Sequence, residues 1–165
     1  MRGKKILFLT LALLLPIAIF IFLKIFGRNE FDVPVMHQEG KVDAPENCDF
    51  TYATPYFIPD SLTAFFEVNN ADSLYVIYFE PGLSVPMKRV TVEIGEASIK
   101  VIPPSVFTLL KTDVRVLKEC ILLVKSPHSI VLLDNRKRIR GYYDGSDRDE
   151  IDRLIVEIKI ILKQY

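Results

Sequence analysis

One stretch near the C-terminal end decides the fold: HSIVLLDNRKRIRGYYDG, residues 128–145. Residues 129–133 form a short apolar run typical of a strand, and the polar residues 135–138 that follow predict a turn. Residues 139–143 are again strand-like, so the two runs predict an antiparallel hairpin.

The residues after this hairpin predict a final helix. Asp147 and Glu150 have the spacing of a capping box, in which two side chains satisfy the first free backbone N–H groups of a helix. One apolar face follows at helical spacing and comprises Ile151, Leu154, Ile155, Ile158, Ile161 and Leu162. We therefore expect an amphipathic helix that packs on the hairpin.

Further strands are predicted upstream of the hairpin. Residues 74–79, LYVIYF, are continuously apolar, as expected for a central strand covered on both faces. Residues 99–102 predict a short strand that the following proline pair ends, and residues 62–68 predict another.

Two segments between these strands have helical features. Ser105 can cap a helix that we expect to run to near Cys120. Residues 86–97 fit either one apolar helix face, with a proline in the first turn, or the alternation of a strand. We favour a helix there.

The resulting order, β-α-β-α-β-β-α, predicts an α/β fold. Strand–helix–strand units pair their strands in parallel, and the closing hairpin adds an antiparallel edge. A thioredoxin-like mixed sheet flanked by helices has this order, and we assign it to residues 61–165.

The N-terminal part differs from this domain. Residues 6–23 carry no charge, a length that nearly spans a bilayer core of roughly 30 Å at about 1.5 Å per residue. Basic residues precede the run and no small-x-small cleavage site follows it, which favours an uncleaved transmembrane anchor at residues 1–28 over a signal peptide. The proline-containing residues 29–60 are expected to be an extracytoplasmic tether and entry segment, with a solvated His37.

The charge balance supports this division. The whole chain has 21 basic and 21 acidic residues, but five of the basic ones lie at or before Arg28 and no acidic residue precedes Glu30. The rest is mildly acidic, unlike a nucleic-acid-binding domain. We expect a single-pass protein of the cytoplasmic (inner) membrane, held there by residues 6–26, with its domain in the periplasm or extracytoplasmic space.

With these features the chain resembles the Sco/SenC family of membrane-tethered copper chaperones for cytochrome oxidase. The similarity is carried by residues 128–134, by residues 138–145 and by the final helix, and Pro59-Asp60 is similar to the family's entry motif. The resemblance implies a thioredoxin-like fold and a copper site made by a Cys-x-x-x-Cys pair and a histidine.

The chain departs from the family at that site. The two cysteine positions fall on Pro81 and Val85, which can neither ligate copper nor form a disulfide. Of the three ligands only His128 remains, and we interpret it as a residual or structural histidine. No resident cofactor is expected; copper would bind only if Cys48 or Cys120 approached His128.

The two cysteines leave alternatives open. Cys48 and Cys120 could form a disulfide that joins the entry segment to the core, or remain two separate thiols with Cys120 buried. Separate thiols are favoured. A catalytic redox pair is disfavoured because such cysteines are normally closely spaced.

Other sites have no support in the sequence, which contains neither a phosphate-binding glycine loop nor a nucleophile elbow. Several of the acidic residues near the last helix are interpreted as caps of that helix, and the basic turn 136–138 is interpreted as a solvated hairpin tip. The acidic residues in question are Asp144, Asp147, Asp149, Glu150 and Asp152.

The sequence therefore predicts a non-enzymatic accessory or assembly factor, with a protein partner around the respiratory cytochrome oxidase and no nucleic-acid partner. Two alternatives remain: a copper-delivery chaperone with a rearranged site of His128 plus a cysteine, and a divergent thiol–disulfide oxidoreductase.

Overall fold

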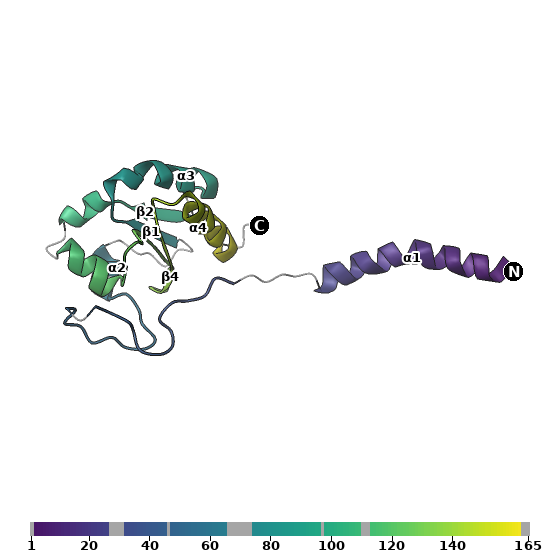
Figure 1. The fold of residues 1–165 in the computed structure, drawn as a ribbon, viewed down its shortest axis with the longest axis horizontal. Coiled ribbons are helices and arrows are strands. Elements are labelled where there is room, and N and C mark those ends of the chain that lie inside the picture. Colours follow the sequence, from purple (N-terminus) through teal and green to yellow (C-terminus); the bar gives the residue numbers. More distant parts are fainter. Residues whose placement is uncertain are drawn as a thin grey trace. The chain divides into compact units, whose positions relative to one another are not determined.

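The computed structural model describes residues 2–26, 32–45, 47–65, 74–96, 98–109 and 113–162. The chain divides into two compact units, Met1–Phe31 and Asp32–Tyr165 (Figure 1). The predicted anchor falls in the first unit and the predicted α/β domain in the second.

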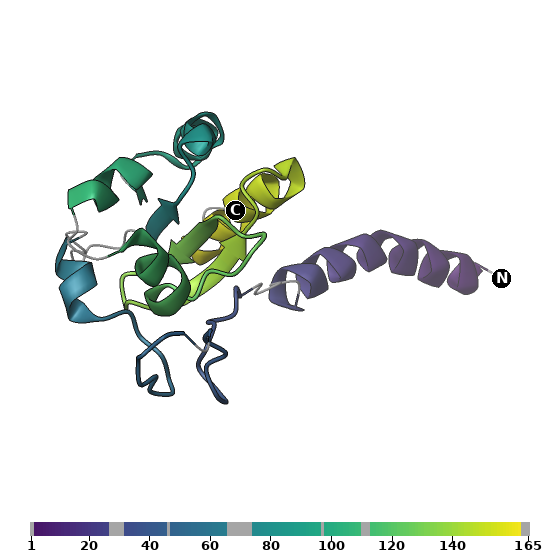
Figure 2. The ribbon, with the colours of Figure 1, turned by 60° about the vertical axis from the view of Figure 1, so that its left-hand side comes forward.

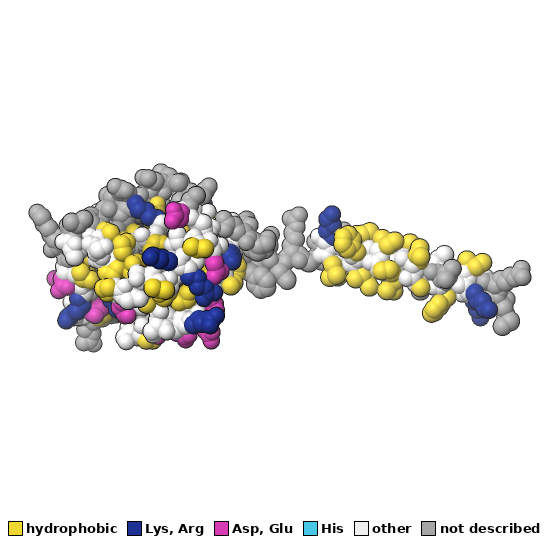
Figure 3. Space-filling view, turned by 90° about the horizontal axis from the view of Figure 1, so that it is seen from above, with side chains coloured by type: hydrophobic (Ala, Val, Ile, Leu, Met, Phe, Trp, Pro, Cys, Tyr) yellow, Lys and Arg dark blue, Asp and Glu magenta, His cyan; other side chains and the backbone are white. Residues whose placement is uncertain are grey.

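The first unit contains one helix, α1 (Arg2–Phe26), with Pro16 inside it. Apolar side chains are exposed along this helix, among them Leu13, Leu14 and Phe20 (Figure 3). No helix among the described residues is long and apolar enough to cross a membrane.

A four-stranded mixed sheet is the centre of the second unit. Its strands are β1 (Leu74–Tyr78), β2 (Ile99–Ile102), β3 (Ile130–Leu133) and β4 (Ile139–Tyr143), in the order β2-β1-β3-β4. β1 is parallel to β2, whereas β3 is antiparallel to both β1 and β4. The α/β class, with a mixed sheet flanked by helices, is confirmed.

Side chains of the sheet pack into two cores, one on each face. Alternate residues of β1 separate them: Val76 and Tyr78 join one core, and Tyr75 and Ile77 the other. The first core is completed by α3 (Ser84–Ile94) and α4 (Arg148–Ile161). Figures 1 and 2 show these helices on one side of the sheet and the entry segment on the other. Because both faces are covered, β1 is apolar throughout.

Several predicted elements are confirmed. The hairpin occupies β3 and β4, the ambiguous segment at 86–97 is the helix α3, and the last helix is α4. The side chain of Asp147 accepts a hydrogen bond from the Asp149 N–H at 2.9 Å and so caps α4.

Two predicted elements are wrong. The first is the strand expected at residues 62–68. Residues 60–65 form the short helix α2 (Asp60–Phe65), and at its start the Leu62 N–H donates a hydrogen bond to the Pro59 carbonyl. Residues 66–68 of that predicted strand lie outside the described residues.

The helix expected from Ser105 to near Cys120 is not continuous. It is divided into η2 (Pro104–Leu109), which is a 3₁₀ helix, and η3 (Val116–Ile121), a π-helix. The Leu122 N–H bonds the Leu117 carbonyl, the five-residue spacing of a π-turn. Residues 110–112 lie outside the described residues. The short helices follow the surface of the second core.

The entry segment lies against the hairpin. The Met36 N–H bonds the Ile139 carbonyl at 2.8 Å, and the Ile58 N–H bonds the Lys137 carbonyl at 2.9 Å. Val33 and Ile58 are buried. Residues 32–45 and 47–58 therefore belong to the second compact unit.

Candidate functional site

The segment after β1 contains the two positions that the resemblance assigns to cysteines. It forms a turn of 3₁₀ helix, η1 (Pro81–Leu83), and then begins α3. Pro81 is exposed and Val85 is 73% exposed, whereas Leu83 between them is buried. The segment thus points an apolar side chain and a proline ring outward at the end of the central strand.

Gly145 and Ser129 hold this segment in place. The Gly145 N–H donates to Ser129 Oγ at 3.1 Å, and the Phe79 N–H, at the end of β1, donates to the Ser129 carbonyl at 3.1 Å. A Cβ at Gly145 would overlap the methyl carbons of Leu83 and lie 2.9 Å from Ser129 Oγ. The absence of a side chain at this glycine therefore permits the close approach of three segments distant in sequence.

His128, the histidine that the resemblance assigns to the copper site, immediately precedes Ser129. Its Nδ1 lies 3.2 Å from the Lys125 carbonyl, and its ring centroid is 6.1 Å from that of Tyr142. The hydroxyl and N–H of Ser146 lower the pKa of Asp144, and His128 contributes a smaller effect in the same direction. Among the described residues, no three His, Cys, Asp or Glu side chains gather in a group that could hold a metal ion.

His37 is only partly solvated, whereas the sequence predicted a solvated side chain. Its Nε2 lies 3.0 Å from the Tyr142 hydroxyl oxygen, and its ring meets that of Tyr56 edge-on. Burial lowers the pKa of His37, and Lys125 lowers it further. The two histidines of the chain therefore both adjoin Tyr142, although 90 residues separate them in sequence.

Cys48 and Cys120 form a disulfide, so the favoured prediction of two separate thiols is wrong. Their Cα atoms are 5.4 Å apart, within the range that a disulfide needs. Cys120 is only 3% exposed because η3 packs against the second core. The sequence could not decide this pairing because it depends on how the entry segment crosses the sheet.

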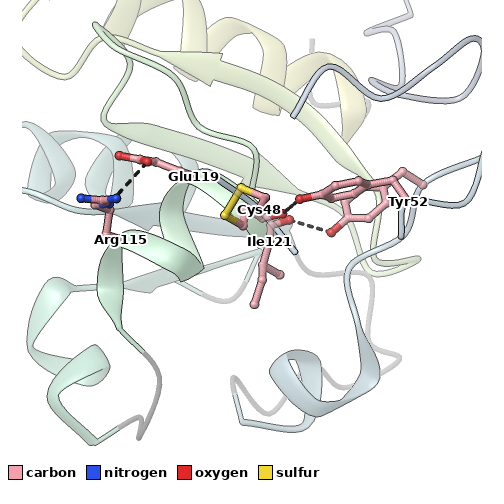
Figure 4. The surroundings of a disulfide bond; sticks show 7 residues. Cys48, Tyr52, Arg115, Glu119 and Ile121 are labelled. Carbon is pink, nitrogen blue, oxygen red and sulfur yellow. Dashed lines mark hydrogen bonds and ion pairs between the residues drawn. A yellow bond between two sulfur atoms is a disulfide. The ribbon is translucent and has the colours of Figure 1, made fainter. Parts of the chain in front are cut away.

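Three tyrosine hydroxyls bind backbone carbonyls at and just after Cys120, and Figure 4 shows Tyr52 near the disulfide. Tyr52 donates its hydroxyl to the Cys120 carbonyl, and Tyr56 to the Ile121 carbonyl, each at 2.8 Å. Tyr142 donates to the next carbonyl, that of Leu122, at 3.1 Å. Consecutive carbonyls at the end of the π-helix thus receive side-chain donors, which satisfies groups that a helix end leaves unpaired.

Burial perturbs these hydroxyls. It raises the pKa of Tyr56 to about 12, with a smaller contribution from Tyr52, and raises that of Tyr142 further. The tyrosines remain protonated near neutral pH and act as hydrogen-bond donors. No sequence motif indicated this cluster.

The acidic residues near α4 have local partners. Asp144 accepts from the Ser146 hydroxyl at 2.6 Å, and Asp152 pairs with Arg89 of α3 at 2.6 Å. Glu150 pairs with Arg153 at 2.8 Å. The cap interpretation is confirmed for Asp147, and the Arg89–Asp152 ion pair joins α3 to α4.

The basic turn 136–138 was predicted to be solvated throughout, but only part of it is. Arg136 is exposed, but Lys137 pairs with Asp60 and Arg138 pairs with buried Asp134 at 2.7 Å. Arg140, which the sequence analysis overlooked, is also buried and binds the Val33 carbonyl. These contacts hold the entry segment against the hairpin.

Comparison with known proteins adds no assignment: no protein-family model, no curated protein and no solved structure matches the chain.

Proposed function

We propose that this chain is a membrane-anchored, thioredoxin-like accessory protein without catalytic cysteines, and that it assists the assembly of a respiratory cytochrome oxidase in the extracytoplasmic space. One observation carries the non-catalytic part of the proposal. The segment that follows the central strand presents Pro81 and Val85 to solvent, and neither side chain can bind copper or exchange a disulfide.

The sheet supports a thioredoxin-like arrangement. Its order is β2-β1-β3-β4, β1 and β2 are parallel and β3 is antiparallel to its neighbours. The Sco/SenC resemblance of residues 128–145 falls on the hairpin of this sheet, and its histidine lies directly before β3. The partner assignment rests on that resemblance.

The anchor is proposed from the apolar surface of α1 and from the basic residues Lys4 and Lys5 near its start. Alkaline carbonate extraction of membranes tests it: an integral protein stays in the pellet, and release of the chain into the supernatant would contradict the anchor. Protease added to intact spheroplasts should digest the domain, since the proposed location is extracytoplasmic.

The partner is tested by purification from detergent-solubilised membranes with a tag after Tyr165. We expect subunits or assembly factors of the oxidase to be enriched over a control in which α1 alone carries the tag. Enrichment of the same proteins by the α1 control would refute a role for the domain, and one tightly bound copper per purified chain would refute the loss of the metal site.

The vacated site can be tested by restoring it. A Pro81→Cys/Val85→Cys variant would supply two thiolates at the positions that the resemblance assigns to the cysteine ligands, and thiolates favour Cu(I). We expect this variant to bind about one Cu(I) under reducing conditions, whereas a Ser84→Cys/Lys88→Cys variant, with the same spacing on exposed positions of α3, should not. Equal binding by both variants would contradict the alignment of Pro81 and Val85 with the ligand positions.

The two alternatives require a free cysteine. In this structure both sulfurs are bonded to each other, so a copper site of His128 plus a cysteine, or a thiol–disulfide exchange cycle, would have to begin with reduction. Neither alternative is favoured by a contact of His128, whose ring adjoins Tyr142 and the Lys125 carbonyl.

A further inference from the structure

The entry segment forms a closed loop over the end of the π-helix. We call residues 37–56 the clasp loop. At its base the Tyr56 N–H bonds the His37 carbonyl at 3.0 Å. Just outside the base, the backbone of Met36 and of Ile58 bonds the hairpin. Both ends of the loop are therefore held by backbone hydrogen bonds that do not involve its middle.

The middle of the loop is held differently. In the described part of the loop, its covalent and polar contacts with the 120–125 segment are the Cys48–Cys120 disulfide, the Tyr52 hydroxyl on the Cys120 carbonyl and an exposed ion pair between Asp43 and Lys125. No backbone hydrogen bond joins residues 38–45 or 47–55 to residues 116–128. An exposed ion pair is a weak restraint, so the disulfide and the burial of Val42 in the second core are the main links.

Residues 120–125, the segment that the loop contacts, contribute apolar side chains to the second core. Leu122, Leu123 and Val124 are buried in the second core, together with Val42 of the loop. Leu123 has a φ of 56°, in the left-handed region that non-glycine residues rarely occupy. Such conformations persist only where surrounding contacts impose them. The turn at 121–124 thus depends on its neighbours, of which the loop is one.

The two sulfur atoms differ in accessibility. Cys48 is half-buried, and its neighbours Asn47, Asp49 and Phe50 are exposed. Cys120 is buried in η3. An attacking thiolate can therefore approach the disulfide from the side of Cys48.

We propose that Cys48–Cys120 is a redox modification site. An external dithiol reduces the disulfide by attack on the sulfur of Cys48 and so releases the middle of the clasp loop from residues 120–125. In the first step the dithiol's thiolate forms a mixed disulfide with Cys48, and Cys120 leaves as a thiolate that takes up a proton. The second thiol of the reductant then attacks the mixed disulfide, and Cys48 leaves as a thiolate that is protonated in turn. Two electrons pass to the protein, and the reductant departs as a disulfide.

The proposal assigns the disulfide the role of a substrate and not of a catalyst. After reduction the base of the loop stays closed, while its middle can move away from residues 120–125. The carbonyl of Cys120 then loses its tyrosine donor, and the turn at Leu123 loses part of its support.

Two measurements on the full-length chain in detergent test this. In the first, the oxidised protein is treated with glutathione, a monothiol that traps the mixed disulfide, and the adduct is located by peptide mass spectrometry. We expect the adduct on Cys48. An adduct mainly on Cys120, or none under conditions that reduce an exposed disulfide, would overturn the proposal.

In the second, hydrogen exchange is compared before and after reduction with dithiothreitol. We expect peptides covering residues 41–55 and 120–125 to lose protection, while β1 and β3 keep theirs. A Tyr52→Phe variant with the disulfide intact is the matched control, and it should keep residues 120–125 protected. Unchanged exchange after complete reduction, or a loss of protection in the oxidised variant equal to that on reduction, would refute the clasp.

Discussion

Replacing Asp134 by alanine should strongly destabilise the domain. Asp134 is 4% exposed and lies at the end of β3. It accepts hydrogen bonds from the backbone N–H groups of Arg136 and Arg138, each at 3.0 Å, and from the Arg138 guanidinium at 2.8 Å. Arg140, also buried, lies 3.6 Å from the same carboxylate.

The magnitude follows from what the substitution leaves behind. Without the carboxylate, the partners of buried Arg140 among the described residues are Asp32 and the Val33 carbonyl, and within that part of the chain its Nε has no hydrogen-bond partner. Removing one member of a buried ion pair typically costs about 3–5 kcal/mol. Because domains are stable by about 5–15 kcal/mol, Asp134→Ala should lower the denaturation midpoint substantially. Asp134→Asn, which retains one acceptor oxygen, should fall between this variant and the wild type.

The assay is urea denaturation of the full chain followed by far-ultraviolet circular dichroism, with the slope m compared between variants. Asp43→Ala is the matched control, since it removes a carboxylate from an ion pair that is fully exposed on the Asp43 side. No resolvable shift in midpoint is expected for the control. The reasoning fails if Asp134→Ala shifts the midpoint no more than Asp43→Ala does at unchanged m.

Other perturbations should have equally specific effects. Burial lowers the pKa of His37. The stabilisation from neutral His37 should therefore be complete above the unfolded histidine pKa of about 6.5 and be lost as the pH falls through the lower pKa of the folded state. In melts at a series of pH values a His37→Gln variant should show a flatter pH dependence of stability, and an unchanged profile would contradict this. Gly141→Ala should cost about 1–3 kcal/mol by overpacking, since a Cβ there would lie 2.5 Å from the buried Tyr143 hydroxyl, and a melting temperature equal to wild type would disprove the clash. A Cys48→Ser/Cys120→Ala variant should lose about 4 kcal/mol under the chain-entropy model, because the bridge joins residues 72 apart; a loss below that of Gly141→Ala would show that the loop is held by its other contacts.

The elements that could be predicted are those whose signal is local. The continuous apolar run at 74–79 indicated a strand covered on both faces, and β1 is buried along its whole length. The face that begins with Ile151 and Leu154 indicated α4, and both side chains are buried against the sheet. Each signal is a repeat within a few residues, which burial on one or two faces imposes directly on the sequence.

The failures have a physical reason too. Residues 62–65 were expected to be extended, but the helix α2 begins at Asp60, directly after a proline, and buries Leu62. The helix expected over residues 105–120 is divided because the chain must follow the second core, in which Phe107 and Leu117 are both buried. In short segments tertiary packing overrides local propensity.

By itself the sequence determined the α/β class, the four strands, the two long helices of the domain and the absence of cysteines at Pro81 and Val85. Only the tertiary structure decided the disulfide, the tyrosines on the π-helix carbonyls and the pairing of His37 with Tyr142. Apart from the hydrogen bond of Tyr142 to the Leu122 carbonyl, these contacts join residues 65 to 105 positions apart. They depend on how the entry segment crosses the sheet, and no short-range pattern of side chains encodes that crossing.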